Sequence, residues 1–179
     1  LYDLALAGDD EPDNKSGMTC SEQLDAIFDR TPELCRKKDE SYARVADALA
    51  KQHICRPSYN DLTSSEKKFV EKYFKKSILP LLSPQIVDNM HPFPHLVNKR
   101  LYIAAVLRHG KNCCYGLIPV SPALSRIVPM PESELRFMLL EDIILQFADL
   151  VFERYEVSEK LVVCVTRNAD IDTDEGLYD

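Results

Sequence analysis

The chain has 179 residues, of which 45% are hydrophobic and 28% are charged, which suits one globular domain or a small domain with an appendage. Its formal net charge of −7 argues against a general nucleic-acid binder such as a DNA-binding protein, since such domains carry a basic excess. We find no signal peptide and no long uncharged apolar run, so we expect no transmembrane segment.

The six cysteines are irregularly spaced and form no Cys-x-x-Cys motif. Cys113 and Cys114 are neighbours on an expected strand, where they would point to opposite faces. We therefore interpret all six as free thiols in a reducing cytoplasm.

The N-terminal segment, residues 1–18, is rich in Asp and Gly and predicts a loop after a short apolar start. Thr19 and Glu22 then form a capping box, which marks the start of a helix. Apolar residues at helical spacing follow to about Gln52. Pro32 lies inside this pattern and should kink the helix or split it in two.

Residues 53–62 interrupt the helical pattern, and we place a domain boundary here. Thr63 and Glu66 form a second capping box and begin a helix that Pro80 should end.

The second half of the chain alternates short strands with turns. The expected elements are strands at 101–107 and 113–118 joined by a hairpin turn, strands at 126–128 and 135–139, a helix at 141–152, a strand at 161–165 and a frayed tail at 170–179. Because strands and helices are grouped, the pattern favours an α+β fold. It predicts a long helical, hairpin-like N-terminal part followed by a small mixed or antiparallel sheet with a packed helix.

The window from Asn89 to Pro131 contains no Asp or Glu, although the chain as a whole is acidic. The cations inside it are Lys99, Arg100, Arg108, Lys111 and Arg126. Guanidinium forks and ammonium groups are suited to phosphate, so a groove for a polyanion could be lined by Lys99, Arg100, Arg108, Arg126 and Arg136. Alternatively, neighbours such as Lys99 and Arg100 point to opposite faces of a strand and form no patch.

His91 and His95 are four residues apart, a spacing at which two imidazoles on a helix can share a metal ion. Pro92 and Pro94 exclude a helix here, and no third ligand of suitable spacing lies nearby. We therefore predict no metal site and interpret the histidines as structural or surface residues.

Several stretches of the sequence resemble one enzyme family. They are Asp13–Met18 (DNKSGM), His91–Ile103 (HPFPHLVNKRLYI), Leu140–Ile144 (LEDII) and Val165–Asp170 (VTRNAD). Together and in this order, they resemble bacterial polyphosphate kinase, a long multidomain enzyme that builds phosphate chains from ATP.

The resemblance implies that residues 1–53 are the C-terminal part of an N-terminal helical domain. Residues 54–179 would then be the head, or middle, domain, truncated at its C-terminal end. The family's catalytic histidines belong to two C-terminal domains, so the resemblance carries no catalytic residue onto this chain. In the family motif at the end of the last strand, Arg167 is a further phosphate-facing candidate, although it could instead pair locally within a turn.

The function expected from the resemblance is that of a piece of an enzyme that reversibly transfers the terminal phosphate of ATP to polyphosphate through a phosphohistidine, with Mg²⁺. The piece would supply scaffold and dimer contacts and be inactive alone, without bound ATP or Mg²⁺. Its partners would be the remaining domains, a second copy of the enzyme and polyphosphate, in the cytoplasm or peripherally at a membrane. The alternative is a non-enzymatic module that binds polyphosphate or RNA through residues 89–131.

Overall fold

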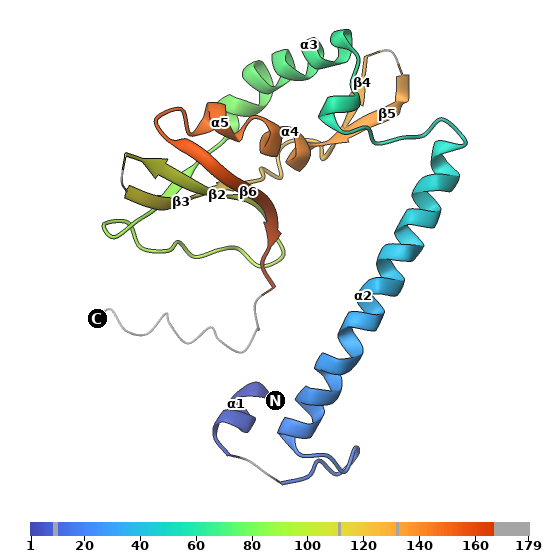
Figure 1. Ribbon diagram of the computed structural model, residues 1–179, viewed down its shortest axis with the longest axis vertical. Coiled ribbons are helices and arrows are strands. Elements are labelled where there is room, and N and C mark those ends of the chain that lie inside the picture. Colours follow the sequence, from blue (N-terminus) through green and yellow to red (C-terminus); the bar gives the residue numbers. More distant parts are fainter. Residues whose placement is uncertain (9–10, 111, 132, 167–179) are drawn as a thin grey trace. The chain divides into compact units, whose positions relative to one another are not determined.

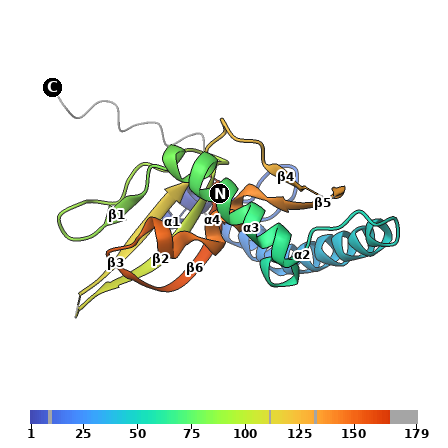
Figure 2. The ribbon, with the colours of Figure 1, turned by 90° about the horizontal axis from the view of Figure 1, so that it is seen from above.

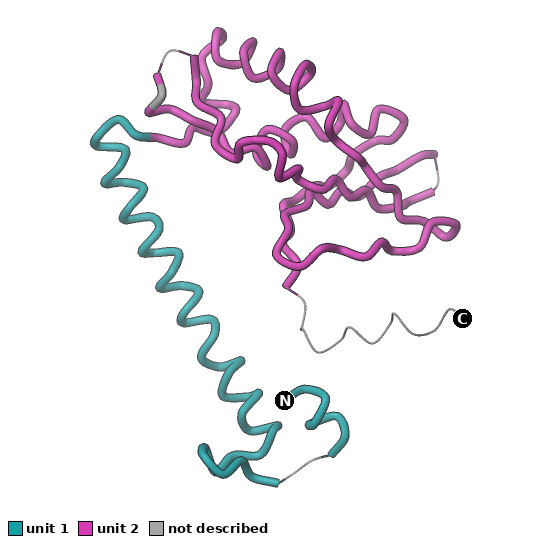
Figure 3. The backbone as a smooth tube through the Cα atoms, turned by 180° about the vertical axis from the view of Figure 1, so that it is seen from behind, with its two compact units in different colours: residues 1–54 teal, residues 55–179 magenta. Residues whose placement is uncertain are grey.

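The computed structural model describes residues 1–8, 11–110, 112–131 and 133–166. The chain divides into two compact units, Leu1–Ile54 and Cys55–Asp179, shown in teal and magenta in Figure 3. Arg167 and the expected frayed tail lie outside the described residues. No helix within the described ranges has both the length and the apolar character needed to cross a membrane.

The first unit consists of a short helix, α1 (Tyr2–Leu6), and a long helix, α2 (Cys20–Ala50). The predicted capping box at the start of α2 is confirmed. The Glu22 amide donates to Thr19 Oγ1 at 3.3 Å, and the Thr19 amide donates to a carboxylate oxygen of Glu22 at 2.8 Å. These two bonds satisfy amides that have no partner within the helix.

Pro32 does not split α2, which runs through it as one helix of 31 residues. Of the two alternatives expected at Pro32, a kink or a split, the split is therefore wrong. A proline lacks the amide hydrogen that would bond the carbonyl of Phe28, four residues earlier. Phe28 is exposed, so water can reach that carbonyl and limit the cost of the missing bond.

The apolar face of α2 is uncovered, because Cys20 is the only buried residue of this helix. The exposed apolar side chains are Ile27, Phe28, Leu34, Tyr42, Val45 and Leu49. Their spacing places them on one side of the helix. Within its described residues, the first unit therefore has no hydrophobic core of its own.

The second unit is an α+β domain, as predicted (Figure 1). Its helices are α3 (Ser64–Tyr73), α4 (Leu140–Gln146) and α5 (Ala148–Val151). Its strands are β1 (Gln85–Val87), β2 (Leu101–His109), β3 (Asn112–Pro119), β4 (Ile127–Met130), β5 (Ser133–Leu139) and β6 (Glu156–Cys164). One antiparallel sheet has the order β1-β3-β2-β6, and β4 pairs with β5 in a second sheet.

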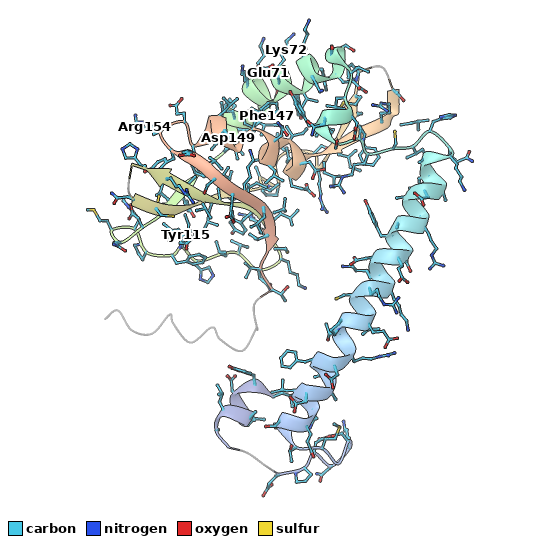
Figure 4. All side chains as sticks on the ribbon, in the orientation of Figure 1. Glu71, Lys72, Tyr115, Phe147, Asp149 and Arg154 are labelled. Atoms are coloured by element: carbon cyan, nitrogen blue, oxygen red, sulfur yellow. The ribbon has the colours of Figure 1, made fainter. Side chains whose placement is uncertain are left out.

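The main core lies between the four-stranded sheet and the helices, which cover the same side of it in Figure 1. Ile103, Leu107 and Ile118 on the covered face of the sheet are fully buried. Phe147 stacks on Phe74 with ring centroids 4.8 Å apart and lies between α3 and the sheet in Figure 4. Figure 2 shows the same elements from above, with α3 nearest to the viewer.

The opposite face of the sheet carries a smaller core of Leu96, Tyr102 and Leu117. The Val97 amide donates to the Tyr102 hydroxyl at 2.9 Å. These contacts hold the proline-rich segment before β2 against the sheet, and the residues just before β2 help to form the candidate site.

Several boundaries differ from the sequence-based prediction, and β1 was not predicted. The helix expected at 141–152 is divided into α4 and α5 at Phe147, whose φ of −103° and ψ of 18° are not helical. The ring of Phe147 packs in the core, so tertiary packing outweighs local helical preference. Pro80 lies within a 3₁₀ turn, Leu79–Leu81, that follows a π-helical turn after α3, and β6 begins at Glu156 rather than Leu161.

Candidate functional site: a basic pocket

A pocket of about 470 Å³ lies in the second unit, among the turn before β2, the loop from β3 to β4, and the start of α4. Its lining residues are Val97, Asn98, Lys99, Arg100, Leu101, Val120, Ser121, Pro122, Leu124, Arg126 and Leu140. Three of them are cations, and none of them is Asp or Glu. The pocket therefore brings together three of the predicted phosphate-facing residues.

Lys99 and Arg100 belong to a turn, because β2 begins only at Leu101. The Lys99 amide donates to the Val165 carbonyl at 2.8 Å, and the Arg100 amide donates to the Val97 carbonyl at 3.2 Å. The alternation of a strand therefore does not separate the two side chains, and both line the pocket. The alternative interpretation, that they point apart on a strand, is wrong for this reason.

The backbone of Lys99 has a φ of 60°, in the left-handed region that residues with a side chain seldom occupy. The bond from its amide to the Val165 carbonyl helps to hold this conformation. Residues with strained backbones cluster at functional sites. The conformation of Lys99 therefore adds to its place in the pocket lining as a reason to include this turn in the candidate site.

Arg126 is anchored by its backbone and by its side chain. Its carbonyl accepts a hydrogen bond of 2.8 Å from the Leu140 amide. Its Nε and Nη2 atoms donate to Glu141 Oε1 at 2.9 and 2.6 Å, and these bonds are the main reason that the pKa of Arg126 is raised. Even so, 62% of the Arg126 side chain is exposed, so the guanidinium remains accessible from the pocket.

Glu141, the partner of Arg126, is a buried carboxylate with 4% exposure. Its Oε2 atom is buried without a hydrogen-bond partner in the described part of the chain. Sequence reasoning quoted Glu141 within the stretch Leu140–Ile144 but did not select it as a site residue. The available signal was its position on the apolar face of the predicted helix, three and four residues before Ile144 and Leu145.

The other predicted phosphate-facing residues do not join the pocket. Arg108 is near the far end of β2 and pairs in register with Cys113 and Glu156. At a rise of about 3.4 Å per residue, it lies on the order of 24 Å along the strand from Leu101. Arg167 lies outside the described residues.

Arg136 faces a structural partner rather than the basic pocket. Its Nε and Nη2 atoms donate to the two carboxylate oxygens of Glu66 at 2.9 and 3.2 Å. Glu66 is 3% exposed, and the hydrogen bonds from Arg136 are the main cause that lowers its pKa to about 2. The sequence-based suggestion that Arg136 lines a phosphate groove is therefore not supported.

A larger pocket of about 660 Å³ lies beside the β2–β3 hairpin, and its lining includes Asp88, His109, Cys113 and Tyr115. Tyr115 lies on the face of the sheet away from the helices (Figure 4). His91 Nδ1 lies 2.9 Å from Asp88 Oδ1, and this contact is the main cause that lowers the pKa of Asp88. Among the residues that the structure describes, no three His, Cys, Asp or Glu side chains are grouped so that they could hold a metal ion.

Comparisons with known proteins give the same family throughout. The sequence profile of the polyphosphate kinase middle domain matches residues 65–179. The chain is 35% identical to a polyphosphate kinase of Exiguobacterium sibiricum over 185 aligned residues, which are 100% of this chain and 26% of the relative. It is 34% identical to that of Bacillus cereus, over 100% of this chain and 27% of the relative.

A crystal structure of polyphosphate kinase from Porphyromonas gingivalis matches with a TM-score of 0.68 and 25% identity, over 83% of this chain and 25% of that chain. The chain thus shares its fold with about a quarter of a polyphosphate kinase chain. The chain belongs to the polyphosphate kinase family, and it spans about a quarter of the length of the relatives that it matches.

Proposed function

We propose that this chain is part of a polyphosphate kinase. In this proposal, the whole enzyme transfers the terminal phosphate of ATP reversibly to polyphosphate through a phosphohistidine, with Mg²⁺. The observation that carries the proposal is the match of residues 65–179 to the middle domain of this family. In this proposal, ATP, Mg²⁺ and the catalytic histidines belong to parts of the enzyme beyond these 179 residues. Residues 1–53 are the end of the N-terminal helical domain, and residues 54–179 belong to the head domain.

The role of the chain in this proposal is to provide scaffold and docking surface. The exposed apolar face of α2 supports this role, since contiguous exposed apolar side chains mark contact surfaces. The partners are the remaining domains of the polypeptide and a second copy of the enzyme. The location is the cytoplasm, an assignment supported by six cysteines that are all free thiols; cell fractionation would detect a peripheral membrane association.

The test is to incubate the isolated chain with ATP, Mg²⁺ and polyphosphate, with a complete polyphosphate kinase as the positive control. We expect the chain to produce no ADP and no longer phosphate chains, because the reactive histidines lie elsewhere. Turnover by the purified chain alone would refute the proposal that it contains no catalytic residue.

The basic pocket favours a second candidate function, in which the chain binds the phosphate groups of polyphosphate or RNA. Lys99 and Arg100 form no ion pair with the described residues, and Arg126 keeps most of its side chain exposed. Three cations around one hollow, without a lining carboxylate, make an electrostatically favourable place for an anion.

Binding of tripolyphosphate, measured by calorimetry at several salt concentrations, tests the second function. We expect affinity to fall steeply with added salt, and the Arg126→Ala variant to bind at least several-fold more weakly with a shallower salt dependence. Arg108→Ala is the matched control, because it removes the same charge at a distance from the pocket and should bind as the parent chain does. No binding at low salt, or equal losses in both variants, would exclude the pocket as the site.

A further inference from the structure

The contact between Glu141 and Arg126 uses only one edge of the guanidinium. Both hydrogen bonds, from Nε and from Nη2, end on the same carboxylate oxygen, Oε1. A guanidinium has five N–H donors, so three remain, two on Nη1 and one on Nη2. Two of these three, one on Nη1 and one on Nη2, point outward side by side and form the edge that binds phosphate oxygens in pairs.

The position of Arg126 is set from two directions. Its carbonyl is bonded to the Leu140 amide, and its side chain is bonded to Glu141, the next residue along the chain. Glu141 itself cannot swing away easily, because it lies in the first turn of α4 and is almost completely buried. The start of α4 therefore holds both ends of Arg126 beside the basic pocket.

We propose that Glu141 is a positioning residue of the basic pocket, which holds the Arg126 guanidinium so that its outer edge meets a phosphate group. This inference rests on the proposed anion-binding function of the pocket. An arginine held in its binding geometry loses less side-chain freedom when the ligand arrives, so the ligand binds more tightly.

Glu141 also carries a negative charge, which by itself repels an anion, so the two effects of the residue have opposite signs. The charge of Glu141 is paired with Arg126. At 0.15 M salt the screening length is about 8 Å, so the repulsion between Glu141 and an anion in the open pocket is weakened. At this ionic strength we expect positioning to outweigh repulsion. A substitution that removes the charge therefore distinguishes the two effects by the sign of its result.

The experiment measures the affinity of tripolyphosphate for the chain at 0.15 M salt. We expect Glu141→Gln to bind about threefold to tenfold more weakly, because a neutral partner holds a guanidinium less firmly. In the Arg126→Ala background, the same substitution should cause no further loss. The control is Asp142→Asn, since Asp142 is the neighbouring carboxylate and pairs with a different arginine, Arg56, away from this pocket.

Arg126→Lys gives a second test that leaves the buried residue intact, with thermal unfolding used to check the fold of every variant. Lysine keeps the positive charge of Arg126 but lacks the planar guanidinium that Glu141 orients. We therefore expect the affinity of Arg126→Lys for tripolyphosphate to approach that of Arg126→Ala. Three results would each overturn the inference. Glu141→Gln could bind more tightly than the parent chain, or it could weaken binding equally in the parent and the Arg126→Ala backgrounds. Arg126→Lys could keep the full affinity of the parent chain. If the parent chain does not bind tripolyphosphate at all, the proposed binding function fails instead.

Discussion

Glu66 and Glu141 are the two buried carboxylates among the described residues, and each is paired with an arginine. The two pairs differ in how they use the arginine. Arg136 meets both oxygens of Glu66, whereas Arg126 meets one oxygen of Glu141 and keeps its outer edge open. The first pair thus joins α3 to β5, while the second leaves donors for a ligand.

The Glu66–Arg136 pair predicts how stability depends on pH. The pKa of Glu66 is lowered from 4.5 to about 2 in the folded chain, chiefly by hydrogen bonding to Arg136. A carboxyl whose folded pKa is depressed stabilises the fold fully above its unfolded pKa and loses that contribution as pH falls through the folded pKa. We expect a loss of about 3 kcal/mol between pH 4.5 and pH 2 from this group.

Chemical denaturation of Glu66→Gln across this pH range checks the prediction. The variant should be less stable by about 3 kcal/mol at pH 7. Its free energy of unfolding should also decrease less steeply as pH falls, because Glu66 no longer titrates. Glu71→Gln is the control on the same helix, because Glu71 forms an exposed pair with Lys75 and should matter by less than about 0.5 kcal/mol. Parallel pH profiles for Glu66→Gln and the parent chain would contradict the prediction.

At the scale of the elements, the β2–β3 hairpin depends on a glycine that is not in a turn. Gly116 lies within β3 opposite Ala105 and faces the side of the sheet that the helices cover. A Cβ atom at this position would lie 2.5 Å from Phe152 Cζ and 2.9 Å from Leu107 Cδ1. The absence of a side chain therefore lets Phe152, just after α5, pack against the strand.

We expect Gly116→Ala to destabilise the chain by about 1–3 kcal/mol, the usual cost of overpacking a core. Thermal or denaturant unfolding measures the loss. Adding Phe152→Leu, which removes the ring that the new Cβ would strike, should recover part of it. Gly116→Ala with unchanged stability would show that the ring moves aside freely.

At the scale of the whole molecule, the two units differ in how they are stabilised. The second unit has a continuous core between sheet and helices, whereas the first unit buries only Cys20 among its described residues. A long helix with an uncovered apolar face obtains little stability from packing, which is normally the main source. The exposed apolar face of α2 is therefore the part of the first unit that the proposed docking role concerns.

The sequence by itself determined the features that depend on neighbouring residues. Both capping boxes, the β2–β3 hairpin and the α+β class follow from patterns a few residues long, and the window without carboxylates is visible in the order of residues alone. Interactions between residues that are close in the sequence are enough to produce these features.

Only the tertiary structure decided which of the cations share a site. Arg126 meets Glu141 across 15 residues of sequence, and Arg136 meets Glu66 across 70. Such pairings depend on how β4, β5, α3 and α4 pack, which no local pattern specifies. For the same reason, the sequence showed a basic window but could not show that Lys99, Arg100 and Arg126 line one pocket while Arg108 lies far along the strand.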